Sequence, residues 1–316
     1  MVLVIYCTER VRRMNVQKKG NWLLFEAPKS WSGLSLEQAF QTKWFVPKKM
    51  LHEWRMTKGV AINDNIVPFH TIISPNDRIR VRIKEEQIEP TPTYAPLHIV
   101  FEDDHVLVVN KRAHIDVHPT QPSQTNTLAN AVAFHFQCEG IYSKVRHIHR
   151  LDRDTSGVIL FAKHALAGAI LDQYLAKRTI HRTYIALVHG YVKQKKGTIE
   201  APIGRDRHHP TRRRVSKTGD TAITHYERLQ YDKQKHVSLV RLTLDTGRTH
   251  QIRVHMSYIG HPLVGDTLYG GKPWIDRQAL HAFSLSFLHP FTGERITCSA
   301  LPDETIFGHI KRGTLL

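Results

Sequence analysis

The 316-residue sequence lacks long apolar runs and contains few cysteines. A membrane-spanning helix needs about 20 mainly apolar residues, whereas the opening apolar run, residues 2–7, is short and leads into charged residues. We therefore expect neither a membrane span nor a secretory signal. Cys7, Cys138 and Cys298 are an odd number, lie far apart and form no CxxC pair. This pattern argues against a disulfide framework and a cysteine zinc site, and it favours a reducing, cytoplasmic setting.

Signatures of several common enzyme classes are also missing. The sequence has no GxGxxG fingerprint, no GxxxxGKS phosphate loop and no GxSxG nucleophile elbow, which removes the usual support for nucleotide-binding, NTPase and hydrolase classes. The 22 histidines suggest a metal site, notably His147 with His149 and His208 with His209, but no HExxH or Cys–His set accompanies them. We expect no metal and no cofactor, and a metal-dependent nuclease is a minor alternative.

Acidic residues are in short supply relative to basic ones. The sequence has 45 Lys and Arg against 28 Asp and Glu, a formal net charge of +17, and a pI near 9.9. With 41% hydrophobic residues the chain can still bury a full core. An excess of positive charge on this scale most often serves a polyanionic partner. Nucleic acid is therefore the first partner to consider.

A proline-rich stretch divides the chain. Residues 88–96 carry three prolines, which favour an extended, solvent-exposed connection. We expect a first domain over residues 1–85, a linker over 86–96 and a second domain over 97–312. The first domain has 15 Lys and Arg against 7 Asp and Glu, a net charge of +8, so it is basic enough to bind nucleic acid by itself.

The first domain is expected to contain two helices followed by strands. Ser35 is suited to cap a helix through Phe40, and a second helix over residues 48–55 would end near Gly59 and present a basic face. Residues 77–84 then alternate charged and apolar side chains, the pattern of a half-buried strand. A solvated strand on a small domain explains this pattern about as well as RNA binding does, and Trp54 beside basic residues favours RNA.

The second domain mixes strands and helices without regular alternation. We expect a helix over residues 127–133 and apolar strands over 158–162, 184–188, 237–244 and 280–287. Because parallel βαβ units would alternate strand and helix, this order favours an α+β fold with a mixed, largely antiparallel central sheet.

The densest polar cluster, residues 147–157, leads directly into one of these strands. Polar residues at the mouth of a buried strand suggest a functional site. Asp152 lies between Arg150 and Arg153, and nearby cations favour the carboxylate form that a nucleophile or an ion-paired anchor requires. Asp152 could instead cap a turn or neutralise a surface arginine, because ion-pair networks also gather acids and arginines.

Two further basic segments are candidates for the site. Residues 245–256 read as a loop feeding a helix, with Thr249 as its cap, and Arg253 in its early turns could pair bidentately with a carboxylate from another segment or be a plain surface arginine. Residues 205–217 read as a flexible basic loop that includes Arg212 and Arg213. Its charge suits a phosphate backbone without specifying a base sequence.

Residues 149–157, His-Arg-Leu-Asp-Arg-Asp-Thr-Ser-Gly, match the HRLDxxTSG signature of the RluA-type pseudouridine synthases, and the resemblance spans roughly residues 97–305. It implies the pseudouridine synthase fold, with Asp152 as the catalytic aspartate, Tyr184 as the active-site tyrosine and Arg253 as the arginine that pairs with the aspartate. By the same resemblance Leu280 would lie beside the target base, and Arg150 would enter the RNA stack when the base leaves it.

The first domain resembles the S-four-like RNA-binding module, or αL motif. In that family two helices carry the basic residues that meet the RNA backbone. The resemblance implies that Lys48, Lys49, His52 and Arg55 are candidates for RNA contact.

These resemblances imply that the protein isomerises uridines of ribosomal or transfer RNA to pseudouridine. The reaction changes no oxidation state, so it needs no cofactor, and a base inside folded RNA must be flipped out to react. We expect structured RNA, with large-subunit ribosomal RNA as the first candidate, as the partner of a monomer with no membrane association. The alternative is a non-catalytic RNA-binding or ribosome-assembly factor.

The sequence departs from the family at one loop. Family members usually read NKPxGxxVHP, whereas residues 110–119 carry Arg112 and His114 in place of that proline and glycine. Losing a proline of fixed φ and a permissive glycine changes the preferred backbone of the turn.

Overall fold

The computed structural model describes residues 2–7 and 14–308. The strands are β1 (Val2–Cys7), β2 (Val16–Lys19), β3 (Trp22–Glu26), β4 (Val60–Ile62), β5 (Asn65–Ile66), β6 (Arg78–Arg82), β7 (Ile99–Glu102), β8 (Val106–Lys111), β9 (Arg146–His147), β10 (Ser156–Ala162), β11 (His181–His189), β12 (Lys196–Glu200), β13 (Ile203–Arg205), β14 (Arg213–Val215), β15 (Ile223–Asp232), β16 (Val237–Leu244), β17 (Leu280–Leu288) and β18 (Arg295–Ala300). The helices are α1 (Leu36–Lys43), α2 (Lys48–Met56), α3 (Leu128–Cys138), α4 (Ala165–Ala176), α5 (Gln251–Tyr258) and α6 (Glu304–Phe307). In the part of the chain described, no helix is long and apolar enough to cross a membrane.

One large mixed sheet forms the body of the protein. Its main path runs β12-β15-β16-β11-β17-β10-β8-β7, with β1, β9 and β18 paired beside it. Neighbouring strands are antiparallel except β10 and β17, which are parallel. The expected α+β class with a largely antiparallel sheet is therefore confirmed.

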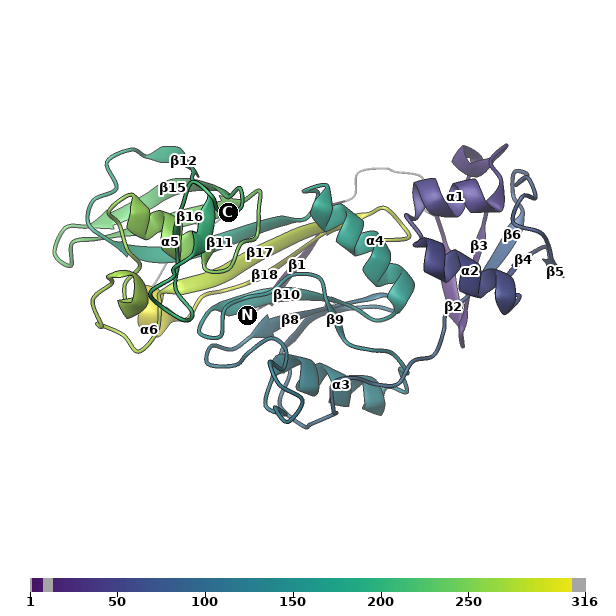
Figure 1. Cartoon of the computed structure of the whole chain (residues 1–316), viewed down its shortest axis with the longest axis horizontal. Coiled ribbons are helices and arrows are strands. Elements are labelled where there is room, and N and C mark those ends of the chain that lie inside the picture. The colour runs from purple at the N-terminus through teal and green to yellow at the C-terminus, as the bar shows by residue number, and fades with distance from the viewer. Residues whose placement is uncertain (1, 8–13, 309–316) are drawn as a thin grey trace.

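The middle of this sheet is buried on both faces. Along β10, Val158 and Leu160 pack in a cluster with residues of α4, and the alternating residues Ile159 and Phe161 pack in a cluster with residues of α3. This follows from the period of two in a strand, which sends successive side chains to opposite faces. Figure 1 shows the two helices flanking the β8–β10 region. The rigid strand β10 carries the polar cluster at its start.

Gly157 allows β10 and β17 to approach each other. Its φ is 117°, and a Cβ at this position would overlap the carbonyl oxygen of Ala282, its partner in the parallel register. Only glycine fits such a conformation at this separation. The final glycine of the HRLDxxTSG segment therefore anchors the loop that carries Asp152 to the strand that carries Leu280.

A smaller module precedes the body and lies at the right of Figure 1. Its five-stranded sheet, in the order β2-β3-β6-β4-β5, packs with α1 and α2 around a core that includes Trp31, Phe40 and Trp44. The expected cap is confirmed, because Ser35 forms a capping box with Gln38 at the start of α1. Strands β2 and β3 were not expected. Trp54, which favoured RNA binding in the sequence, is buried in the module and donates its Nε1–H to the Arg82 carbonyl, so it belongs to the core.

The division into a first domain and a linker differs from the structure at two places. Strand β1 was placed in the first domain, but it pairs with β18 of the large sheet. Residues of the proline-rich stretch and its approach are held against the body: the Glu86 carboxylate pairs with Arg146 at 2.6 Å, and the Val145 N–H donates to the Glu89 carbonyl. The module also contacts the body directly, where Phe291 packs edge-on against Trp44.

Candidate active site

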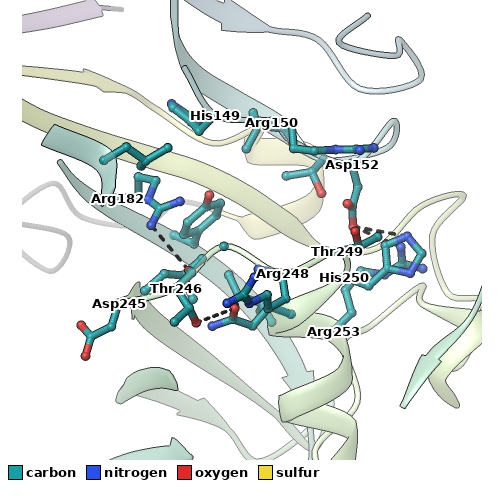
Figure 2. Close-up of a pocket in the computed structure, with 18 of the residues that line it drawn as sticks. His149, Arg150, Asp152, Arg182, Asp245, Thr246, Arg248, Thr249, His250 and Arg253 are labelled. Atoms are coloured by element: carbon teal, nitrogen blue, oxygen red, sulfur yellow. Dashed lines mark hydrogen bonds and ion pairs between the residues drawn. The ribbon is translucent and has the colours of Figure 1, made fainter. Parts of the chain in front are cut away.

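Three segments of the large domain converge on one cavity of about 520 Å³. They are the polar loop between β9 and β10, the first half of β11, and the loop between β16 and α5 together with the start of that helix; the end of α4 and Leu280 at the start of β17 complete the lining. Figure 2 shows side chains of the three segments facing one another. The predicted residues that line this cavity are Arg150, Asp152, Tyr184, Arg253 and Leu280. Side chains separated by up to 130 positions are thus brought to one site.

Lys111 holds the loop that carries Asp152 in place through backbone hydrogen bonds. This lysine is 1% exposed, and its ammonium group donates to the carbonyl oxygens of Arg112, Ile115 and Arg153 at 2.8–2.9 Å. Burial lowers the pKa of Lys111 to about 8, although Asp154, Asp152 and Asp116 oppose the shift. The three bonds tie the loop after β8 to the loop that presents Asp152.

Arg253 pairs with Asp152, as the resemblance implies, but its shorter hydrogen bonds are to Asp266. Its Nη1 donates to Asp152 Oδ2 at 3.2 Å, whereas its Nε and Nη2 donate to the two oxygens of Asp266 at 2.7 and 2.9 Å. Burial alone would lower the pKa of Arg253, but the ion pairs with Asp266 and Asp152 outweigh it and raise that pKa. The expected bidentate pair therefore exists, with Asp266 as the partner.

Asp266 and His250 were missed as site residues. Both lie in segments included in the family resemblance, but nothing in their spacing predicted their roles. His250 Nε2 lies 3.9 Å from Asp152 Oδ2. Arg253 and His250 both approach Oδ2. The other carboxylate oxygen, Oδ1, has no hydrogen-bond partner within residues 2–7 and 14–308. That oxygen is free to meet a substrate.

The proton on His250 can be located from its neighbours. The backbone N–H of Arg213 donates to the Tyr269 hydroxyl oxygen at 2.8 Å, so the hydroxyl proton is available to His250 Nδ1, also at 2.8 Å. Burial lowers the pKa of His250. In the tautomer in which this hydroxyl donates to Nδ1, the neutral ring carries its proton on Nε2, which faces Asp152. His250 itself precedes α5 in the left-handed region, at φ 58°, so the prediction of Thr249 as the cap is wrong.

Tyr184 and Leu280 form the apolar wall of the cavity. They come from the paired strands β11 and β17 and are 5% and 4% exposed. Burial raises the pKa of Tyr184, with Arg182 opposing the shift and Asp152 adding to it. The phenol therefore stays protonated near neutral pH and can donate a hydrogen bond or stack, but it is a weak base.

The other predicted contacts lie outside the cavity or at its rim. Arg150 lines the cavity and is exposed. The expected flexible loop is instead a hairpin of β13 and β14, in which Asp206 holds Arg212 at 2.6 Å and Arg213 is placed beside Tyr269. The segment was predicted without regular structure, and the strands at its two ends and the acid that pairs with one of its arginines correct that prediction.

The four residues predicted on α2 are not brought to the cavity. Lys48, Lys49 and His52 are exposed on the small module. Arg55 is also exposed, but its guanidinium pairs with Glu37 and lies over the Phe69 ring. Arg55 is thus engaged in the fold of its own module.

The departure from the family loop has a local explanation. His114, which replaces the glycine, adopts φ 66°, a left-handed conformation that histidine tolerates better than most residues. Its Nδ1 lies 3.1 Å from Asp154 Oδ1, and its Nε2 lies 3.4 Å from Asp276 Oδ2. The turn therefore keeps the backbone that a glycine would favour, and the ring bridges two acidic residues.

The histidines that suggested a metal have other surroundings. The His147 ring stacks on His118, with centroids 4.8 Å apart, and His149 Nε2 accepts the Leu160 N–H. His209 Nδ1 accepts N–H groups of its own turn. Within the described ranges, no group of three or more His, Cys, Asp or Glu side chains is arranged to hold a metal ion.

The mixed sheet carries an arginine-paired carboxylate in a cavity rich in basic side chains, and comparisons with known proteins identify the family as one of RNA-modifying enzymes. The family model described as RNA pseudouridylate synthase matches residues 105–258, and the model described as the RluD ribosomal pseudouridine synthase N-terminal domain matches residues 23–79. A Bacillus subtilis (strain 168) protein named "Uncharacterized RNA pseudouridine synthase YhcT" is 46% identical over 90% of this chain and 95% of its own length.

Two further relatives agree. Ribosomal large subunit pseudouridine synthase D of Vibrio cholerae is 38% identical over 82% of this chain and 85% of its own length. The solved structure of human RNA pseudouridylate synthase domain containing 1 matches with a TM-score of 0.55 and 28% identity, covering 68% of this chain and 86% of that one. The chain belongs to the RluA-type family of RNA pseudouridine synthases, and it is an enzyme of that family.

Proposed function

We propose that this enzyme converts specific uridines of large-subunit ribosomal RNA to pseudouridine, with Asp152 as the catalytic carboxylate. The observation that carries the assignment is the placement of Asp152 in the cavity, where Arg253 and His250 approach Oδ2 and leave Oδ1 without a partner among the described residues. Relatives named ribosomal large subunit pseudouridine synthase D support the choice of RNA. Transfer RNA is the alternative substrate.

The reaction breaks the glycosidic bond from the ribose to uracil N1 and forms a bond from the same ribose carbon to uracil C5. C5 loses one proton and N1 gains one, so substrate and product have the same atoms, and no oxidation state changes. In this proposal Asp152 either attacks the ribose or uracil as a nucleophile or removes a proton from the ribose while uracil departs as an anion. No cofactor and no metal is required by either route.

Each neighbour of Asp152 has a part in this scheme. Arg253, itself locked by Asp266, keeps the carboxylate ionised and aimed. Tyr184 and Leu280 enclose the uracil ring, with the phenol stacking on the base and donating rather than accepting a proton. A flipped base costs a few kcal/mol of lost stacking, and Arg150 at the rim is the side chain we assign to fill the vacated position in the RNA.

RNA affinity is assigned to basic surfaces outside the cavity. The exposed residues Lys48, Lys49 and His52 of α2, and the β13–β14 hairpin with Arg213, supply contacts to backbone phosphates that give affinity and orientation. Arg55 and Arg212 contribute less in this proposal, because each already pairs with an acid. A ribosomal RNA substrate also implies work in the cytoplasm, and we propose that one chain suffices.

The test uses purified protein and an in vitro transcript of large-subunit ribosomal RNA. Wild type is expected to convert defined uridines, read by pseudouridine mapping, and Asp152→Asn is expected to bind the transcript with similar affinity but to convert none. Full activity in Asp152→Asn would refute the role of Asp152. Binding by wild type without any converted uridine, in ribosomal or transfer RNA, would favour a non-catalytic RNA-binding factor.

A further inference from the structure

Arg182 is a buried cation in the cavity wall without an acidic partner. It lies on β11 and is 8% exposed. Its Nη2 reaches the Thr246 carbonyl only at 3.5 Å, and its Nε has no hydrogen-bond partner. No carboxylate of the described chain lies within 4.0 Å of its guanidinium. Figure 2 shows this side chain crossing the cavity wall toward Thr246.

Three other arginines that line the cavity pair with acids, whereas Arg150 is exposed at its rim. Arg253 binds Asp152 and Asp266, Arg178 lies 4.0 Å from Asp245, and Arg248 lies 3.7 Å from Asp220. Arg182 has no acidic partner, and it is more deeply buried than Arg178 and Arg248. A buried and unpaired charge is costly for the folded protein. A ligand that brings a negative charge would remove that cost on binding.

Strand geometry aims Arg182 at the same space as the catalytic group. Arg182 and Tyr184 are two positions apart on β11, so their side chains share a face. Gly247 completes the pocket, because a Cβ there would lie 2.9 Å from Arg182 Nη1. The absence of a side chain at Gly247 therefore leaves the guanidinium room to face the cavity.

The immediate neighbours of Arg182 do not neutralise it. Burial, with smaller contributions from Arg182 and His147, lowers the pKa of His149 to about 3, so this ring is neutral. The Tyr184 phenol is also neutral, since burial raises its pKa. The guanidinium thus faces two uncharged side chains.

We propose that Arg182 forms a binding site for a backbone phosphate of the nucleotide whose base lies against Tyr184. This inference rests on the proposed function, and it adds a charged contact inside the cavity to those on the surface. A guanidinium presents a planar fork that matches two phosphate oxygens. A uracil carbonyl could accept one hydrogen bond, but it would leave the buried charge without a counter-charge. The phosphate of the flipped nucleotide supplies both the hydrogen-bond acceptors and the counter-charge.

The test combines stability with the salt dependence of RNA binding. Arg182→Met is placed in the inactive Asp152→Asn protein, and its affinity for a large-subunit ribosomal RNA transcript is measured over a range of KCl concentrations. Removing one phosphate contact should weaken binding about tenfold and reduce the slope of log affinity against log salt by about one unit. The melting temperature should be unchanged or higher, because an unpaired buried charge has been removed.

Arg228→Met is the matched control. Arg228 is also a strand arginine, but it donates to the Val192 carbonyl at 2.8 Å and lies over the Tyr191 ring. Its loss should lower the melting temperature and leave the salt slope unchanged. Arg182→Lys provides a second variant that retains the charge while losing the fork, and it should keep most of the slope with weaker binding.

Three results would overturn the inference. An unchanged affinity for Arg182→Met would show that Arg182 does not contact RNA, and weaker binding with an unchanged salt slope would show that its contact is not a phosphate. A large loss of stability would show that the side chain serves the fold. Turnover by the protein with Arg182 and Asp152 both intact is measured separately, so failure of the enzymatic assignment is distinguishable from failure of this site.

Discussion

Arg253 binds Asp266 through two hydrogen bonds, at 2.7 and 2.9 Å, and Asp152 through one, at 3.2 Å. The two acids differ in exposure as well, because the side chain of Asp266 is 1% exposed and that of Asp152 is 18% exposed. Asp266 thus acts as the anchor of the arginine, and in the proposed function the remaining oxygen of Asp152 meets the substrate. The arginine is positioned before any RNA binds, which is the preorganisation that electrostatic catalysis requires.

Removing the anchor should damage both stability and turnover. Asp266→Asn leaves the buried guanidinium with one weak acidic contact, and breaking a buried pair of this kind costs about 3–5 kcal/mol of unfolding free energy. We expect a lower kcat as well, because Arg253 no longer aims Asp152. Chemical denaturation and single-turnover assays measure the two effects. Asp64→Asn, at an exposed pair with Arg78 and Arg80, is the control and should change neither. Wild-type turnover in Asp266→Asn would contradict the anchoring role.

The hydroxyl of Tyr269 should matter through His250. Tyr269→Phe removes the group that accepts the Arg213 N–H and that donates to His250 Nδ1. We expect a loss of about 1–2 kcal/mol of stability from the unpaired N–H and a decrease in kcat with little change in KM, because the His250 ring is no longer fixed beside Asp152. Steady-state kinetics checks the split. A rise in KM alone would mean that Tyr269 serves only RNA binding.

Gly157 should tolerate no side chain. In Gly157→Ala the new methyl group would overlap the Ala282 carbonyl and force β10 and β17 apart, so we expect a loss of several kcal/mol or failure to fold. Gly140→Ala is the matched control, since Gly140 also has a positive φ but open space around it, and about 1 kcal/mol should be lost there. Equal losses in thermal unfolding would attribute the Gly157 effect to backbone conformation alone.

Stability should fall in mild acid because of buried histidines such as His281. Its Nε2 donates to the Ala300 carbonyl, so its Nδ1 accepts the Ser156 hydroxyl proton, and burial lowers its pKa to about 4. A lowered folded-state pKa means that the unfolded chain binds more protons below about pH 6.5, so stability is lost as pH falls from 6.5 toward 4. A shift of this size is worth about 3 kcal/mol. His281→Gln should flatten the pH dependence of unfolding between these values, and an unaltered profile would contradict this account.

The sequence was a good guide to elements with strong local patterns. The apolar run over β16 was predicted with its observed bounds, and the Ser35 cap and the alternation along β6 were also confirmed. Strands β2 and β3 were missed because both are short, β2 carries polar residues, and the apolar run of β3 shows no alternation. The pairing of β1 with β18 joins residues almost 300 positions apart, and no local pattern carries that information.

The candidate site shows the same division. The motif around Asp152 and the resemblance led to Tyr184, Arg253 and Leu280, which do line one cavity. The two hydrogen bonds between Asp266 and Arg253 depend on how the loop that carries Asp266 packs against α5 in three dimensions. The position of Trp54 depends on tertiary structure in the same way: a tryptophan among basic residues favoured RNA binding in the sequence, but its Nε1–H is bonded inside the module.

The most direct test of the central claim is pseudouridine mapping across all cellular RNA in cells that lack this protein, rescued in parallel by wild type and by Asp152→Asn. We predict that defined sites in large-subunit ribosomal RNA lose pseudouridine in the deletion and that wild type alone restores them. If no site changes in the deletion, or if Asp152→Asn restores the sites as wild type does, the assignment of Asp152 as the catalytic residue of a ribosomal RNA pseudouridine synthase is contradicted.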